Sequence, residues 1–360
     1  MLPASLESFF PALARRVEFA SLGVFPTPVE RLAGLAGGDA YVKRDDLSSP
    51  VYGGNKVRTL EVLLGEALRE GARVAYSTGA YGSNHALATA LHAPRIGLEG
   101  GAMLFPQPPS PAASENLRVT ATRATRLVDL AHWSLLPFGI ARERLAARRR
   151  GEGVFVMVPG GATPLGAFGY VAAGLELGLQ VAEGALPAPR AVYVGVGSTC
   201  TSAGLLIGLG LAARLGVGFE RAPLLVSVRV TPWPVTSAFR ILGLALRTGA
   251  LLRAFSGDAR AEFSRAELAA RFRIEAGFLG AGYGRPTHAG AAARARLEPL
   301  GLTLDTTYSE KSAAGLLAAL DRGTQGPTVF WATKSSAPLP EVDPAALAAL
   351  PRRLRAFIAD

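Results

Sequence analysis

The chain has 360 residues, of which 49% are hydrophobic and 18% charged, so it can bury a core large enough for one large or two modest domains. Its formal net charge of +10 comes from basic residues scattered along the chain rather than gathered in a stripe with aromatics, so we expect no nucleic-acid partner. Glycine, proline or arginine interrupts every apolar stretch before the roughly 18 residues of a membrane span, and the first residues do not resemble a secretory signal. A single cysteine, Cys200, provides no disulfide framework and no metal cluster, so we expect a cytoplasmic protein without a metal site.

Predicted strands alternate with predicted helices along the chain. Short apolar runs rich in Val, Tyr and Phe predict strands over residues 40–42, 73–77, 102–105, 154–158, 191–194, 224–230 and 328–331. Segments rich in Ala, Leu and Arg predict helices over residues 57–70, 84–91, 165–177, 203–215 and 312–320. This alternation predicts an α/β fold with a mostly parallel sheet covered by helices.

Lysine is rare enough to restrict the candidates for amine chemistry, because the chain holds it only at positions 43, 56, 311 and 334. Lys56 closes the turn Gly53-Gly54-Asn55-Lys56 just before an expected helix, where two glycines let the backbone approach a ligand. A partly apolar site there would lower the pKa of the lysine and let its amine condense with an aldehyde. The alternative is a solvated surface lysine.

A second turn, over residues 79–85, joins an expected strand to an expected helix and ends in Ser83-Asn84-His85. The hydroxyl, the amide and the free N–H groups of a helix start would suit a carboxylate or a phenolate. The alternative is that Ser83 or Asn84 only caps the helix and that His85 is exposed.

A third turn follows an expected strand, opens an expected helix and reads Gly195-Val196-Gly197-Ser198-Thr199-Cys200-Thr201. Small residues and hydroxyls over a helix N-terminus can cradle phosphate, because the free N–H groups and the helix dipole favour an anion. The alternative is a dinucleotide fingerprint, but Cys200 stands at its sixth position and no acidic residue ends the following strand. We therefore expect a cradle for the phosphate of a smaller cofactor.

Two tyrosines near glycines complete the set of candidates. Tyr283 stands between Gly282 and Gly284, and Tyr308 directly precedes Ser309. Tyrosines in a site can carry protons, whereas tyrosines in strands usually pack with the hydroxyl bonded to backbone. Spacing alone does not decide between these interpretations.

In their order and spacing these segments resemble the D-cysteine desulfhydrase and 1-aminocyclopropane-1-carboxylate deaminase family of fold-type II pyridoxal-phosphate enzymes. The similar segments include residues 43–46, 53–56, 83–85, 159–170, 282–286 and 308–315, and the resemblance spans about residues 27–333. It implies two three-layer αβα domains with mostly parallel sheets, the tryptophan synthase beta-like fold, with pyridoxal 5′-phosphate in the cleft between them. It also implies a large domain of residues 1–56 and 171–360, a small domain of residues 57–170, and a homodimer.

The resemblance also implies a role for each matching position. Lys56 matches the Schiff-base lysine, and Asn84 matches the residue that bonds the phenolic oxygen of the cofactor. The phosphate loop is matched by Gly197, Ser198, Thr199, Cys200 and Thr201. The loop that receives the substrate carboxylate is matched by Ser83, Asn84 and His85. Tyr283 and Tyr308 match the two active-site tyrosines, and Ser309 the partner of the pyridine nitrogen, unless it only caps the following helix.

Two positions favour β-elimination within this family. Deaminases resemble one another in placing Glu after the second tyrosine, where a carboxylate keeps the pyridine nitrogen protonated. Here that position is Ser309, and Thr333 matches a threonine of the desulfhydrases where deaminases tend to have Leu. The resemblance therefore implies a lyase that removes the α-proton of a small D-amino acid and releases its β-group, a 2-oxo acid and ammonia. The alternatives are a ring-opening deaminase and a non-catalytic protein that binds pyridoxal phosphate.

The chain departs from the family pattern around the expected substrate pocket. The usual His-Thr-Gly-Gly after the last strand is replaced by Ala332-Thr333-Lys334-Ser335, and the usual Gln before Ser83 is replaced by Gly82. Thr287 stands where an acidic residue is expected after Pro286. An enzyme that acts on another D-amino acid or on a β-substituted amino acid is therefore also compatible with the sequence.

Borohydride reduction tests the expected linkage between lysine and cofactor. The purified protein should be yellow, and reduction followed by peptide mapping should find the cofactor on Lys56, because this lysine follows the glycine turn. An adduct on Lys43, Lys311 or Lys334 would overturn the assignment.

Overall fold

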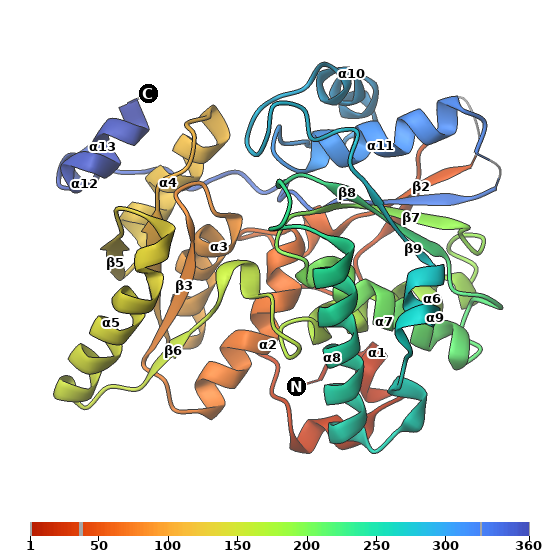
Figure 1. Ribbon diagram of the computed structural model, residues 1–360, viewed down its shortest axis with the longest axis horizontal. Coiled ribbons are helices and arrows are strands. Elements are labelled where there is room, and N and C mark those ends of the chain that lie inside the picture. The colour runs from red at the N-terminus through yellow and green to blue at the C-terminus, as the bar shows by residue number, and fades with distance from the viewer. Residues whose placement is uncertain (1, 36–38, 325, 360) are drawn as a thin grey trace.

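The strands of the computed structural model, which describes residues 2–35, 39–324 and 326–359, form two sheets (Figure 1). The six-stranded sheet has the order β1-β2-β10-β7-β8-β9, and the four-stranded sheet has the order β5-β4-β3-β6. Their bounds are Val29–Arg31 (β1), Ala40–Lys43 (β2), Val74–Ala80 (β3), Glu99–Phe105 (β4), Arg126–Asp129 (β5), Val154–Val156 (β6), Ala191–Val196 (β7), Leu224–Arg229 (β8), Phe272–Glu275 (β9) and Thr328–Trp331 (β10). Among the described strands only β1 pairs antiparallel, with β2.

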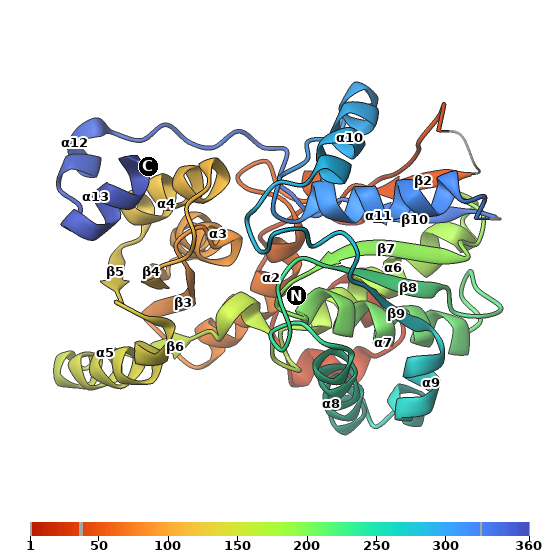
Figure 2. The same ribbon diagram turned by 45° about the horizontal axis from the view of Figure 1, so that its top comes forward.

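Helices cover both faces of both sheets. They are Ala4–Glu7 (α1), Asn55–Arg69 (α2), Asn84–His92 (α3), Pro111–Arg123 (α4), Leu136–Arg150 (α5), Phe168–Ala182 (α6), Cys200–Arg214 (α7), Ala238–Ser256 (α8), Arg265–Ala270 (α9), His288–Leu297 (α10), Ser309–Asp321 (α11), Pro344–Ala348 (α12) and Arg352–Ala359 (α13). Figure 2 shows α10 and α11 on one side of the six-stranded sheet and α6, α7 and α8 on the other.

The alternation of side chains along the central strands explains these layers. In β7, Val192 and Val194 are buried against α6 and α7, whereas Tyr193 is buried in a separate core against α11. In β3, Tyr76 lies in the core beneath α5, whereas Ala75 lies in the core beneath α2 and α3. The expected α/β architecture of two three-layer units with mostly parallel sheets is therefore confirmed.

All the expected strands and helices overlap observed ones, but the sequence patterns missed others. The missed strands β1, β5 and β9 are short edge strands, each with a charged residue at an end, so they carry too little periodicity to detect. Among the helices that the sequence analysis did not predict, α5 is rich in arginine and buries few side chains, so it has no broad apolar stripe.

The C-terminal helices pack beside the four-stranded sheet, where α12 and α13 contact α4 (Figure 1). The cause is apolar burial, because Leu354 and Phe357 enter the same core as Tyr81 and Leu117. The Phe357 ring meets the Tyr81 ring edge-on with the centroids 5.0 Å apart. The assignment of residues 171–360 to the large domain stays a prediction, as do the other expected boundaries.

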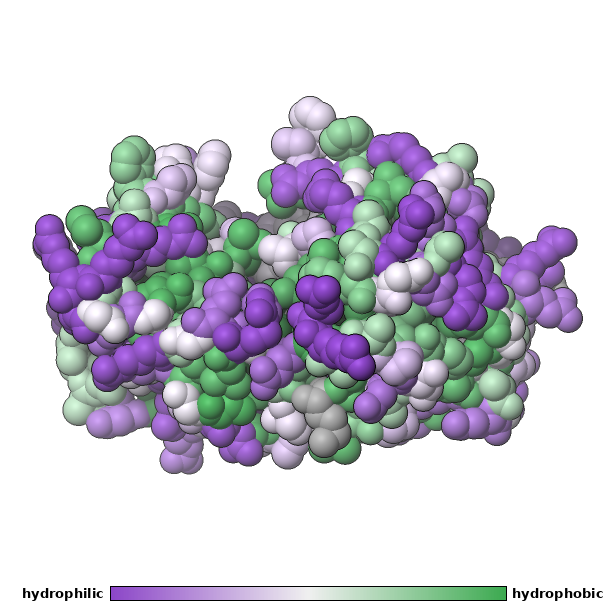
Figure 3. All heavy atoms as spheres, turned by 90° about the horizontal axis from the view of Figure 1, so that it is seen from below, coloured by the Kyte–Doolittle hydropathy of each residue, from purple (hydrophilic) through white to green (hydrophobic). Residues whose placement is uncertain are grey.

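Charged and apolar side chains are mixed over the surface, as Figure 3 shows for one face. Part of the arginine excess is paired, for example in the cluster where Arg126 contacts both Glu99 and Glu152 at 2.8 and 3.0 Å. Within the described residues, no helix has both the length and the apolar character that crossing a bilayer requires.

A buried ionic network connects α2 to the six-stranded sheet. Arg58 of α2 donates to Asp45 at 2.8 Å and to Glu176 of α6 at 2.9 Å, and all three are at most 6% exposed. Lys43 of β2 donates to Glu176 at 2.5 Å, so two cations face two carboxylates. The carboxylate of Asp45 also accepts the indole N–H of Trp331 at 2.7 Å. Arg58 lies two residues after Lys56, so this network fixes the helix that carries the candidate amine.

Removal of Arg58 should destabilise the protein strongly. We expect Arg58→Met to lower the free energy of unfolding by about 3–5 kcal/mol, because it leaves Asp45 and Glu176 buried without their main partner. The matched control is Arg69→Met, which removes an exposed partner of Glu66 on the same helix and should cost less than about 1 kcal/mol. Urea unfolding measures both, and equal losses would contradict the assigned importance of the network.

Candidate active site

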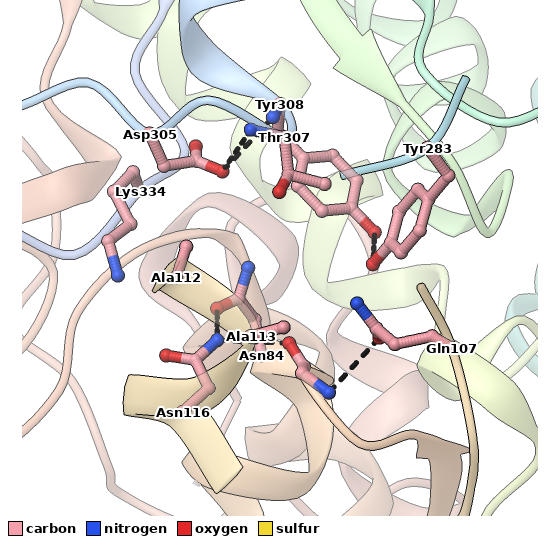
Figure 4. A pocket seen from close by; sticks show the side chains of 11 residues that line it. Asn84, Gln107, Ala112, Ala113, Asn116, Tyr283, Asp305, Thr307, Tyr308 and Lys334 are labelled. Carbon is pink, nitrogen blue, oxygen red and sulfur yellow. Dashed lines mark hydrogen bonds between the residues drawn. The ribbon is translucent and has the colours of Figure 1, made fainter. Parts of the chain in front are cut away.

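Two adjoining hollows lie where α2, α3, α4 and α11 meet. The first is lined by Gly82, Asn84, Gln107, Ala112, Ala113, Asn116, Tyr283, Asp305, Thr307, Tyr308 and Lys334 (Figure 4). The second is lined by Asn55, Lys56, Asn84, Asp305, Tyr308, Thr333 and Lys334. The structure therefore brings together five residues that the sequence singled out: Lys56, Asn84, Tyr283, Tyr308 and Thr333.

The Lys56 turn is held rigidly against the segment after β10. Gly54 has φ +86°, and a Cβ built on it would lie 2.4 Å from the carbonyl oxygen of Thr333, so only glycine fits. The amide N–H of Asn55 donates to the same carbonyl at 3.1 Å, and that of Gly53 donates to Ser335 Oγ at 2.8 Å. Burial lowers the pKa of Lys56, which favours the uncharged, nucleophilic amine.

The Asn84 side chain is oriented by two donors that the sequence analysis missed. Tyr52 donates its hydroxyl to Asn84 Oδ1 at 2.9 Å, and Asn116 donates its Nδ2 to the same oxygen at 2.7 Å (Figure 4). With its oxygen occupied, the amide of Asn84 presents Nδ2 as a donor. Both partners lie 32 residues away along the chain, so no local motif could indicate them.

The side chains of Ser83 and His85 lie outside the lining of both hollows. Ser83 Oγ accepts the N–H of Ala86 at 3.2 Å as the N-cap of α3. His85 is 1% exposed, and neither of its ring nitrogens has a partner among the described residues. Burial lowers the pKa of His85 to about 3, so the ring is neutral. Their role in receiving a substrate carboxylate stays a prediction, and the structure offers Gly82 and Asn84 nearer to the hollow.

Gln107 supplies an amide at the position where Gly82 lacks a side chain. A Cβ on Gly82 would lie 2.7 Å from the Cα of Ala113, so the start of α4 excludes any larger residue there. Gln107 Oε1 instead accepts the N–H of Gly82 at 3.1 Å, and its side chain points into the hollow beside Tyr283 (Figure 4). The glutamine missing from the usual position is thus matched by one from the loop before α4.

The third turn, for which the sequence predicts a phosphate cradle, joins β7 to α7. Thr199 has φ +74°, the only positive φ among the described residues other than glycine, and it stands as the N-cap of α7. No hydrogen bond of the described residues uses the N–H groups of Ser198 or Cys200, so these donors are available to an anion. The carbonyl oxygen of Gly197 accepts a hydrogen bond from the hydroxyl of Thr236 at 2.5 Å, which fixes its orientation.

Cys200 contributes to this cradle through its backbone rather than its thiol. The side chain is fully buried, and its S–H donates to the carbonyl of Gly161 at 3.3 Å. Burial raises the pKa of the thiol to about 11, so it stays protonated. Thr201 Oγ1 accepts a hydrogen bond from Nδ2 of Asn55 at 3.1 Å, which links the cradle to the Lys56 turn.

The two tyrosines form a pair on the wall facing Gln107. Their hydroxyl oxygens lie 3.1 Å apart, and the rings meet edge-on with centroids separated by 5.9 Å. Burial raises the pKa of both Tyr283 and Tyr308, so both hydroxyls stay protonated. Lys311 donates to the carbonyls of Leu279 and Gly282 at 2.8 Å, which fixes the segment carrying Tyr283 and occupies this lysine.

Ser309 lies behind the hollow and bonds to Asp305, which the sequence analysis missed. Its hydroxyl donates to Asp305 Oδ1 at 2.7 Å, and the residue is 1% exposed. The same carboxylate accepts the N–H groups of Thr307, Tyr308 and Ser309 at 3.0–3.1 Å and so caps the start of α11. Asp305 therefore caps the helix, and the predicted contact of Ser309 with a pyridine nitrogen stays a prediction.

Together these groups fit pyridoxal phosphate. The amine of Lys56 has no hydrogen-bond partner within the described part of the chain and lines the second hollow with the free donor of Asn84. The cradle at the start of α7 offers N–H groups that lack acceptors, and Asn55 joins it to the lysine turn. A nucleophilic amine, a donor for a phenolate and an anion cradle are the groups this cofactor requires.

Substitution in the cradle should abolish cofactor retention. Gly197→Glu places a carboxylate among the N–H donors, and its Cβ alone would lie 3.0 Å from the Tyr308 ring. We expect cofactor affinity to fall at least about tenfold, because the charge repels phosphate. Gly243→Glu is the matched control, since the nearest atom to its Cβ is the far end of Arg247 at 3.7 Å. Visible absorbance after gel filtration reports retention, and normal affinity in folded Gly197→Glu protein would refute the cradle.

Comparison with known proteins agrees with this site. The family model of pyridoxal-phosphate dependent enzymes matches residues 20–333. The chain is 36% identical over 327 residues to nocardicin C-9′ epimerase of Nocardia uniformis subsp. tsuyamanensis, covering 88% of this chain and 92% of that protein. It is 32% identical over 320 residues to D-cysteine desulfhydrase of Salmonella choleraesuis, covering 85% and 90%.

A solved structure gives the same result for the fold. The crystal structure of an ACC deaminase homologue superposes with a TM-score of 0.72 at 28% identity, covering 94% of this chain and 96% of that one. The residues that the family model matches include every described strand of both sheets and every residue that lines the two hollows except Lys334, which directly follows the last matched residue. The chain therefore belongs to the family of pyridoxal-phosphate dependent enzymes.

Proposed function

We propose that this enzyme is a D-cysteine desulfhydrase-like lyase that eliminates the β-substituent of a small D-amino acid. The observation that carries the proposal is that the amine of Lys56, whose pKa is lowered by desolvation, lines one hollow with Tyr308, whose hydroxyl lies 3.1 Å from that of Tyr283. The amine can accept the α-proton, and a phenol can donate a proton to the departing group. A 32% identical relative is named D-cysteine desulfhydrase, which supports this reaction class.

Each residue has a defined task in this reaction. Lys56 would hold pyridoxal phosphate covalently, and the bound cofactor would withdraw electrons from the α-carbon. The amine of Lys56 would accept the α-proton of the bound substrate. The electron pair of that C–H bond forms the new Cα–Cβ double bond as the β-group departs with its own pair. Tyr308 or Tyr283 protonates the departing group, and water then releases the 2-oxo acid and ammonia.

The residue after the second tyrosine distinguishes elimination from ring opening. Ser309 offers a neutral hydroxyl, and that hydroxyl already donates to Asp305. A neutral neighbour withdraws less electron density through the pyridine than a carboxylate that keeps its nitrogen protonated. Expulsion of a sulfur group needs less withdrawal than opening a cyclopropane, so Ser309 supports elimination.

Epimerisation is a second candidate, and the 36% identical relative named as an epimerase favours it. Inversion requires a proton to leave one side of the α-carbon and return on the other. Lys56 belongs to the start of α2 and the tyrosine pair to the segments around α10 and α11, so the two proton carriers lie on different elements. Proton return to carbon gives inversion, whereas proton delivery to the β-group gives elimination.

A substrate panel separates these reactions. We expect D-cysteine and β-chloro-D-alanine to release a 2-oxo acid and 1-aminocyclopropane-1-carboxylate to release none. Tyr308→Phe should slow release by about 10²–10⁴, since it removes a positioned proton donor. Tyr193→Phe, a change at another buried tyrosine in β7, should have no effect. Solvent deuterium at Cα with inversion and no 2-oxo acid would replace the proposal with epimerisation.

A further inference from the structure

Lys334 presents an amine to both hollows from a fixed backbone. The carbonyl of Thr333, on one side, accepts the N–H of Asn55, and Ser335 Oγ, on the other side, accepts the N–H of Gly53. The segment is thereby bonded to the turn that carries Lys56. Figure 4 shows the Lys334 side chain extending along the wall of the first hollow, on the side away from Tyr283 and Gln107.

The charge of Lys334 is not neutralised within the described part of the chain. No carboxylate there lies within ion-pair distance of its amine, which instead lies 5.6 Å from the centroid of the Tyr52 ring. Asp305 is the acidic residue on the same wall. Its carboxylate already accepts three backbone N–H groups and the hydroxyl of Ser309, so it is committed to the start of α11.

The other lysines of the chain show how unusual this arrangement is. Lys43 is bonded to Glu176 and to Gln180, and Lys311 is bonded to two carbonyls. Lys56 serves as the proposed cofactor amine. Among the four lysines, Lys334 lines both hollows and has no polar partner among the residues that the structure describes, so its ammonium group can attract an anion.

Groups other than Lys334 can bind the α-carboxylate of an amino acid. The start of α3 provides the N–H groups and the Asn84 amide, and Gln107 adds a further amide beside Gly82. Lys334 comes from a different segment, after β10. The additional charge therefore matches a second anionic group of the substrate.

We propose that Lys334 selects amino acids whose β-substituent ends in a carboxylate. This inference rests on the proposed function, because it names the substrate class of the same site. Lys334 acts here as a specificity residue: it holds the distal carboxylate by a charge-assisted hydrogen bond and takes no part in proton transfer.

Binding is tested with a ligand that cannot undergo elimination. 2-Aminoadipate has the shape of S-carboxymethylcysteine with CH₂ in place of sulfur, and its distal amide is the neutral match. Calorimetric titration of the holoenzyme with both enantiomers of each should show at least about tenfold tighter binding of the acid, as one charge-assisted bond provides. Equal binding of acid and amide would overturn the proposal.

Variants then assign the preference to Lys334. Lys334→Met should abolish it, Lys334→Glu should reverse it and Lys334→Arg should keep it. Arg118→Met, which removes an exposed charge from α4 beside the hollow, should leave it unchanged. If Lys334→Met weakens acid and amide equally, the amine holds the α-carboxylate or supports the fold, and the proposal fails.

Turnover distinguishes failure of this inference from failure of the proposed function. The holoenzyme should release a 2-oxo acid from S-carboxymethylcysteine with a higher kcat/KM than from S-carbamoylmethylcysteine, the matched amide. A preserved binding preference without any 2-oxo acid would refute elimination and leave the specificity role standing. Release of a 2-oxo acid at equal rates from both would refute the specificity role and leave elimination standing.

Discussion

The geometry of this protein depends on a neutral cluster of buried charges beneath the site. Lys43 belongs to β2, Asp45 to the turn after it, Arg58 to α2 and Glu176 to α6, so the cluster joins three segments of the chain. Burial opposes ionisation of Asp45, but the adjacent Arg58 outweighs it and lowers the pKa of the carboxyl. Burial of any one of these ions alone would cost several kcal/mol, and only the other ions of the cluster offset that free energy. The cluster therefore forms in one arrangement or not at all. This requirement sets the orientation of α2 and therefore the direction in which Lys56 points.

The sequence predicted the parts of the site that are carried by local motifs. The sequence predicted the position of the Lys56 turn, of the turn before α7 and of the strand that leads into each. These positions were predictable because glycines at a strand-to-helix junction are required by the local backbone conformation. The central strands were also readable, since they are continuous apolar runs. The edge strands β1, β5 and β9 and the arginine-rich α5 lack such a signal, and their structure comes from tertiary contacts instead.

What the sequence did not reveal depends on approach between distant segments. Tyr52 and Asn116 orient Asn84 from positions 32 residues before and 32 residues after it in the chain. Neither belongs to a local motif that would indicate this role. The same holds for Gln107, whose role follows only from the contact of α4 with Gly82. The side chain of His85 is buried in the packing of α3, where burial keeps it neutral, and its predicted contact with a substrate stays untested. A motif thus identified the neighbourhood, while the fold decided which side chains reach the hollow.

The path of the chain between the two sheets restricts how the molecule can move. The backbone crosses from one sheet to the other at the turn before α2, again before α6, and a third time between β10 and α12 (Figure 2). Two bodies joined at a single point can swing freely, but three tethers at separate points leave mainly small twisting and sliding motions. The last tether begins at the segment that carries Lys334 and is bonded to the Lys56 turn. A motion of one sheet relative to the other would therefore displace the segment that carries Lys334 and the Lys56 turn bonded to it. Such a motion is thus mechanically coupled to the affinity of the site for its ligand.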